Sequence, residues 1–214
     1  MQPASGALRE GILYDLLGRM SDHDMREATV AEFARRYHVD EKQAARVERS
    51  AMRLFNAIAP RNAAEREEAR RFLAWAARLH EIGISIAHSG YHKHSAYILE
   101  NADMPGFSST DQTRLALLAR AQRGALGKLP QFSPGNREHL GETDRLLAWM
   151  LRQAVLLCRS RTDGQPEDIA AEVTADGYRL RLPQEWLNSN PLTRRALEEE
   201  AGEWEAVGVS VQYD

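Results

Sequence analysis

Four of the seven histidines of this 214-residue chain fall within fifteen consecutive positions, together with a glutamate and a lysine. The cluster consists of His80, Glu81, His88, His92, Lys93 and His94. Histidine titrates near neutral pH and is the commonest metal ligand in proteins. The cluster therefore predicts a metal site, an anion site or a set of hydrogen bonds that organise the backbone.

A metal site would need these side chains to converge on one point. His80 and Glu81 are adjacent, so on a helix they point about 100° apart. The next three histidines follow at spacings of four and two residues, and a bend at Gly90 would bring two of them towards His80. A bound ion would support hydrolysis by lowering the pKa of its water. The alternative is that the histidines cap helix ends and bond backbone carbonyls.

An anion site is the second alternative, because the segment Gly90–His94 opens a helix. The free N–H groups and the dipole of a first helical turn attract phosphate, and Lys93 adds charge. Basic residues recur along the same half of the chain: Arg46, Arg49, Arg53, Arg70, Arg71, Arg78, Arg120, Arg123 and Lys128. These sets are equally compatible with solvated helix faces.

The charge is unevenly distributed along the chain. Residues 1–161 carry 24 Lys and Arg against 19 Asp and Glu, whereas residues 162–214 carry 4 against 12. This change of sign predicts two units, of which the first attracts polyanions. We expect a helical domain over 1–161 and a small α+β domain over 162–214.

Several classes of function have no support in the sequence. No apolar run approaches the roughly 18 residues that cross a membrane, and the N-terminus lacks a secretion signal. The single cysteine, Cys158, lies in an apolar setting that is unfavourable for a reactive thiol. The phosphate-loop, dinucleotide, serine-hydrolase and zinc-protease motifs are all absent. We expect a cytoplasmic protein with no nucleic-acid or membrane partner.

The elements that must position this cluster are helices, because apolar residues recur with helical periodicity over most of the chain. We expect helices at 7–19, 30–37 with Thr29 as N-cap, 41–58 with Asp40 as N-cap, 63–82, 92–101, 109–123 with a cap at Ser108 or Ser109, and 136–161. The tail changes to alternation. Strands are predicted at 169–175 and 178–182 around an Asp-Gly turn, then a helix at 191–205 and a strand at 208–213.

The segment 79–107, LHEIGISIAHSGYHKHSAYILENADMPGF, closely resembles the C-terminal part of bacterial exopolyphosphatases and of the related guanosine pentaphosphate phosphohydrolases. Residues 7–15 resemble the segment where that family's chain leaves its catalytic half. Trp186-Leu187, Asn190–Thr193, Leu197-Glu198 and Trp204 resemble its C-terminal tail.

The resemblance implies an HD-like helical domain followed by a small ββαβ domain, and hence a mainly α fold. In the family, phosphate hydrolysis and its divalent metal, Mg, belong to N-terminal α/β domains, which nothing here matches. The chain thus looks like the C-terminal half alone, a natural or engineered fragment. That half is thought to bind the polyphosphate chain and to form a homodimer.

The resemblance also bears on a metal in the helical domain. His80-Glu81 resembles the His-Asp pair of HD phosphohydrolases, with Glu in place of Asp. Gln43 and Gln122 stand where related sequences carry histidine, and 151–154 contains no Asp. Glutamine is a poor ligand for zinc or manganese, so we expect no metal, no cofactor and no catalytic residue in this chain.

Our first hypothesis is therefore a module that binds inorganic polyphosphate, supports dimerisation and partners N-terminal catalytic domains, but is inactive alone. The expected phosphate-binding residues are His92, Lys93, His94, Arg120 and Arg123. His80, Glu81 and His88 would organise the turn, as a possible vestigial metal site. The alternatives are an independent HD-type metal-dependent phosphohydrolase using His80 and Glu81, and a pure scaffold.

Two further expectations follow from the same residues. Charged imidazoles attract anions, so affinity for polyphosphate should rise as His92 and His94 gain protons. Trp186 and Trp204 are aromatic residues that could be exposed, which favours a homodimer.

Overall fold

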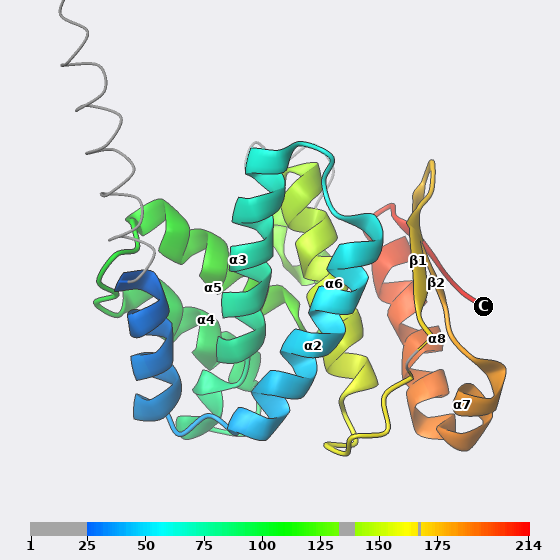
Figure 1. The fold of residues 1–214 in the computed structure, drawn as a ribbon, viewed down its shortest axis with the longest axis horizontal. Coiled ribbons are helices and arrows are strands. Elements are labelled where there is room, and N and C mark those ends of the chain that lie inside the picture. Colours follow the sequence, from blue (N-terminus) through cyan, green and yellow to red (C-terminus); the bar gives the residue numbers. More distant parts are fainter. Residues whose placement is uncertain (1–24, 133–139, 167) are drawn as a thin grey trace, which may run out of the picture.

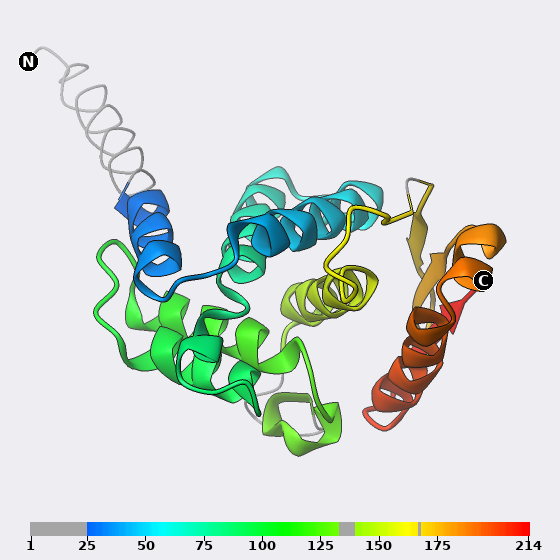
Figure 2. The same cartoon turned by 90° about the horizontal axis from the view of Figure 1, so that it is seen from below.

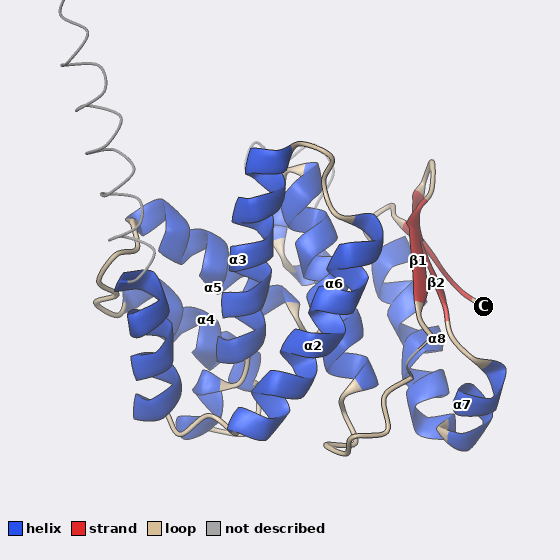
Figure 3. Cartoon of the chain, in the orientation of Figure 1, coloured by secondary structure: helices blue, strands red, loops and turns tan. Residues whose placement is uncertain are grey.

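The computed structural model describes residues 25–132, 140–166 and 168–214 of the chain. Helices dominate, and a three-stranded sheet lies near the C-terminus (Figure 3). The predicted fold class, mainly α with a small α+β end, is confirmed. The helix expected at 7–19 lies outside the described residues.

The helices expected from residues 41, 63 and 109 begin at these positions (Figure 1). After a helical segment at 25–36, its elements are α2 (Glu41–Ile58), α3 (Ala63–Leu79), α4 (Tyr91–Asn101), α5 (Ser109–Ala121) and α6 (Glu142–Leu157). Asp40, Asn62 and Ser108 each accept a hydrogen bond from a backbone N–H of the first helical turn. The expected cap at Thr29 is wrong, because this residue lies inside a helix and donates to Pro105 O.

α3 ends three residues earlier than predicted, and residues Ile82–Ser85 form the short 3₁₀ helix η1. The cause is close packing against α4. A Cβ on Gly83 would lie 2.2 Å from Tyr91 O and 2.3 Å from Ser95 N. Ser95 Oγ accepts from Gly83 N and donates to His80 O, at 2.9 Å each. The end of α3 is thereby fixed to the first turns of α4.

The C-terminal part consists of β1 (Ala170–Val173), β2 (Gly177–Arg181), α7 (Gln184–Ser189), α8 (Pro191–Glu205) and β3 (Ser210–Tyr213). β2 is the central strand, antiparallel to β1 and parallel to β3. The parallel pairing follows from the helical connection, which returns the chain to the starting end of β2. The short α7 was not predicted. Two 3₁₀ turns, η2 (Leu126–Lys128) and η3 (Pro130–Phe132), follow α5.

α6 lies between the other helices and the C-terminal part (Figure 2). It contacts α2, α3 and α5 as well as α8. Trp149 of α6 stacks on Tyr178 of β2 at 4.9 Å between ring centroids, and Tyr178 contacts Trp204 of α8 at 5.9 Å. The buried apolar residues form one continuous cluster across both parts. The domain boundary between residues 161 and 162 therefore stays a prediction.

None of the described helices is long and apolar enough to cross a membrane.

Candidate functional site

His80 lies at the C-terminal end of α3, and its side chain is 1% exposed. Its Nδ1 is 2.7 Å from Ala77 O. A carbonyl oxygen only accepts hydrogen bonds, so Nδ1 carries the proton and Nε2 presents a lone pair. Burial lowers the pKa of His80, and the imidazole is neutral. Nε2 is buried without a hydrogen-bond partner among the described residues.

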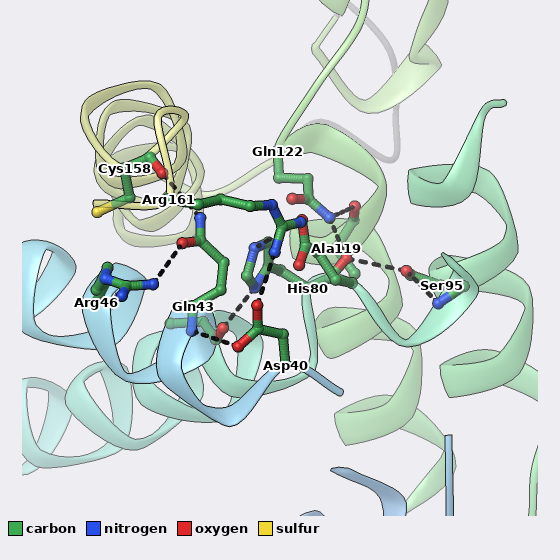
Figure 4. Close-up of polar contacts among 12 residues, drawn as sticks. Asp40, Gln43, Arg46, His80, Ser95, Ala119, Gln122, Cys158 and Arg161 are labelled. Carbon is green, nitrogen blue, oxygen red and sulfur yellow. Dashed lines mark hydrogen bonds and ion pairs between the residues drawn. The ribbon is translucent and has the colours of Figure 1, made fainter. Parts of the chain in front are cut away.

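Glu81 forms an ion pair with Arg161, whose guanidinium nitrogen is 2.5 Å from Glu81 Oε1. Another nitrogen of the same guanidinium is 3.1 Å from Asp40 Oδ2. Asp40 is also the N-cap of α2, and the hydrogen bond from Gln43 N, helped by the charge of Arg161, lowers the pKa of Asp40. Arg161 therefore joins the start of α2 to the end of α3 (Figure 4). Its backbone has φ 56°, a left-handed conformation that is uncommon outside glycine.

These residues do not fit an HD-type metal. Gln43 Nε2 donates to Cys158 O at 2.9 Å, and Gln122 Nε2 donates to His80 O and Ala119 O. Both amides thus bond the backbone (Figure 4), and the charge of Glu81 is balanced by Arg161. Among the residues that the structure describes, there is no group of three His, Cys, Asp or Glu that could hold an ion.

The start of α4 holds three of the five predicted phosphate-binding residues, and the other two, Arg120 and Arg123, lie at the end of α5. Gly90 precedes it with φ 68°, and no side chain caps the helix. Lys93 is exposed and His94 is half-buried, whereas His92 is buried. His92 Nε2 faces the next segment, since a Cβ on Gly124 would lie 3.2 Å from it. Of the five predicted residues, His92 is therefore the least accessible to a surface ligand.

The pKa of His92 reports the positive charges around it. Burial, then the charges of Arg120, Arg123 and Lys93, lower this pKa to about 4. Arg152 adds to the same effect. Three of these cations come from α4 and from α5 and its C-terminal end, and the fourth, Arg152, is buried on α6. This pKa disfavours the expectation that His92 is charged near neutral pH.

Arg152 was not recognised from the sequence. Its guanidinium is 3% exposed and forms an ion pair with Glu200 of α8, which is 6% exposed. It also donates to Ala121 O at 2.6 Å and to Gly124 O at 3.0 Å. One signal was available, because Arg152 is the only charge within the apolar run 146–157. A lone arginine on such a helix implies a buried partner.

A cavity of about 590 Å³ lies over the same region. It is lined from α2, η1, the start of α4, the end of α5, α6 and α8. Three predicted residues line it, namely Glu81, His88 and Arg123, together with the two glutamines. The structure places Lys93, His94, Arg120 and the buried His92 outside this lining. A larger cavity of about 850 Å³, near the start of α6 and the β1–β2 turn, is lined by none of the predicted site residues.

Comparison with known proteins gives a consistent result. Residues 25–201 match the family described as Ppx/GppA phosphatase, domain III. Similar relatives carry the name guanosine-5'-triphosphate,3'-diphosphate pyrophosphatase. The protein from Pseudoalteromonas translucida is 36% identical over 96% of this chain and 41% of its own length.

Two further relatives of the same name show the same relation. The protein from Aeromonas hydrophila is 36% identical over 97% of this chain and 42% of its own length. That from Photobacterium profundum is 34% identical over 94% of this chain and 39% of its own. The chain therefore spans about two fifths of the length of the curated relatives it matches.

Proposed function

Because this chain belongs to the Ppx/GppA phosphatase family, which it matches through domain III, we propose that it binds a chain of phosphates and does not cleave it. The expected ligand is inorganic polyphosphate. The observation that carries this proposal is the packing of α4, which holds Lys93, against α5, which holds Arg120, with Arg123 beside Tyr91. Lys93, Arg120 and Arg123 come from two packed helices and their adjoining turn, and they offer charge to several phosphates at once.

The start of α4 adds to this attraction. Its first N–H groups lack a side-chain cap, and a phosphate oxygen is a suitable acceptor for them. Arg123 lies 5.6 Å from the ring centroid of Tyr91, which restricts its guanidinium beside that helix start. We infer that the neutral His92 supports the surface by packing, and that the lysine and arginines supply the charge.

The printed name of the relatives supports a second candidate for the ligand, a guanosine phosphate with chains of phosphates at both the 5' and 3' positions. Both candidates present linked phosphates. They differ in length, because a long polyphosphate can occupy several weak sites together and gains affinity from doing so.

Catalysis by this chain alone is not part of the proposal. Arg161 balances Glu81, and the two glutamines bond the backbone, so the His80–Glu81 pair lacks the ligands of an HD-type hydrolase. We propose that hydrolysis, with its divalent metal, belongs to N-terminal catalytic domains that act together with this chain. Purified chain with magnesium or manganese should release no orthophosphate from polyphosphate. Turnover that disappears in His80→Ala would contradict this.

The proposed homodimer rests on the family resemblance. The reason given from the sequence holds only in part, because Trp204 is buried and Trp186 is half-buried with its Nε1 donating to Gly164 O. Light scattering at tens of micromolar tests the proposal, and a monomeric mass would contradict it for this chain.

Binding is tested by titrating long-chain polyphosphate against the triple variant Lys93→Ala, Arg120→Ala, Arg123→Ala. The plot of log affinity against log salt concentration has a negative slope. Loss of three phosphate contacts should reduce the magnitude of this slope by about 2. The matched control removes three arginines that already pair with carboxylates, the exposed Arg35 and Arg195 and the half-buried Arg71. Equal losses in both variants, or no binding at low salt, would refute the proposed surface.

A further inference from the structure

The 590 Å³ cavity carries an inference that does not rest on polyphosphate binding. Its volume lies within the range of sites for small molecules, about 300–1,000 Å³. Its walls combine apolar side chains, such as Ile84 and Leu156, with the ring of Tyr91 and with charges of both signs. This mixture suits a compact ligand that has both a flat ring and an ionic group. It suits a bare chain of phosphates less well.

Arginines at the cavity provide the site for an anion. Arg123 and Arg159 both line it and are exposed. Arg159 donates to Leu192 O at 2.9 Å. Over 25–132, 140–166 and 168–214, neither guanidinium has a carboxylate within ion-pair distance, whereas Arg152 and Arg161 do. His88 is exposed at the same cavity. A phosphate ester is the anion that the planar fork of arginine binds best.

An unpartnered acceptor lies on the inner side of the cavity. Gln122 is 3% exposed, and its Oε1 has no donor within the described part of the chain. The orientation of this amide is fixed because its Nε2 donates to two carbonyls, those of His80 and Ala119. Figure 4 shows Oε1 on the side of Arg161, away from those carbonyls. A buried acceptor without a donor is unfavourable, and a ligand N–H would satisfy it.

The acidic residues of the cavity do not oppose an anion at the arginines. Glu81 and Glu200 are balanced by Arg161 and Arg152. The other two belong to the α8 wall, where Glu199 pairs with Arg195 and Glu203 accepts from Leu126 N. The carboxylates on this wall can accept further N–H groups. Acceptors on the inner side and unpaired arginines at the opening define a ligand with donors at one end and a phosphate at the other.

We propose that this cavity binds a small phosphate ester that carries N–H donors on a flat ring, such as a nucleoside monophosphate. The ring would lie against Tyr91 and donate to Gln122 Oε1, while the phosphate would bind Arg159 and Arg123. A polyphosphate chain has no N–H donor, so it would leave the Gln122 oxygen unpartnered. The site shares Arg123 with the proposed polyphosphate surface, but Lys93 and Arg120 lie outside the cavity lining.

Calorimetric titration at low salt tests the proposal with AMP, GMP, ribose 5-phosphate and adenosine. At least one nucleotide should bind with one equivalent per chain. Ribose 5-phosphate and adenosine should each bind with an affinity at least about tenfold lower. Arg159→Ala should weaken the nucleotide about tenfold and leave polyphosphate binding unchanged. Lys93→Ala with Arg120→Ala should do the reverse, so failure of one site is distinguishable from failure of the other.

Two further variants complete the test. Gln122→Met should reduce nucleotide affinity towards that of ribose 5-phosphate. Arg35→Ala is the matched control for Arg159→Ala, because neither Arg35 nor its partner Glu32 lines the cavity. Circular dichroism melts establish whether each variant is folded. If Gln122→Met is unfolded, the nucleotide affinity of Arg159→Ala decides whether the proposal holds. No nucleotide binding at millimolar concentration, equal binding of ribose 5-phosphate, or full binding by Arg159→Ala would overturn the proposal.

Discussion

Replacing Arg152 by methionine should destabilise the chain severely while keeping most of the side-chain volume. Arg152 and Glu200 are 3% and 6% exposed, so the change leaves a buried carboxylate without its counter-ion. Removing one partner of a buried ion pair typically costs about 3–5 kcal/mol. The carbonyls of Ala121 and Gly124 lose a donor as well. We expect a loss of unfolding free energy at the upper end of this range, a large share of the total for a single domain.

Urea unfolding followed by tryptophan fluorescence and circular dichroism measures this loss. Glu200→Gln on the Arg152→Met background removes the orphaned charge. The unfolding free energy of the double variant should therefore be at most about 1 kcal/mol below that of Arg152→Met. Arg195→Ala is the control, because Arg195 lies on α8 in an exposed pair whose loss costs about 0–1 kcal/mol. A loss below about 1 kcal/mol for Arg152→Met would refute the buried-pair reasoning.

Three further predictions address the surrounding structure. Gly83→Ala should be destabilised by about 1–3 kcal/mol or more, since the new Cβ would meet α4 backbone, whereas Gly127→Ala has open space and should melt like the parent. Asp40→Ala should lose about 1 kcal/mol of unfolding free energy through the missing cap of α2, measured by urea titration. His92 has a folded pKa of about 4, below its unfolded value of about 6.5, so the unfolded chain binds more protons between these values and stability should fall as pH falls from about 6.5 to 4. This slope should flatten in His92→Gln, and an NMR titration showing His92 protonated at pH 6.5 would contradict it.

Local signals predicted the fold well where one residue decides the outcome. Asp40 and Ser108 begin helices because their side chains accept the free first-turn N–H groups. The turn before Gly177 joins two strands, and the tail alternates as a strand should. The end of α3 was missed because it depends on the approach of Gly83 to α4, a contact between separate elements. Thr29 is a frequent cap residue, but its hydroxyl bonds Pro105 O, 76 residues away.

The site shows a different limit of the sequence. The residue types around His80 and His92 marked the correct region, and the cavity and the cations lie there. Their roles depend on burial, which residue type does not reveal. His92 is neutral because it is buried among cations, and Arg161 reaches Glu81 across 80 positions. Long-range ion pairs of this kind leave no periodic pattern, so Arg159 and Arg161 were not expected at the site.

The pairing of Arg152 with Glu200 has a consequence for synthesis on the ribosome. The arginine emerges 48 residues before its partner, an interval of about 2–10 s at ordinary elongation rates. Until α8 emerges, the growing chain holds an uncompensated guanidinium on α6, and Tyr178, which stacks on Trp149, lacks its contact with Trp204. Nascent chains stalled after Arg152 has left the exit tunnel, but before Glu200 has left it, should therefore expose this face to chaperones and proteases. Full protection should arise only when the last turns of α8 have left the tunnel.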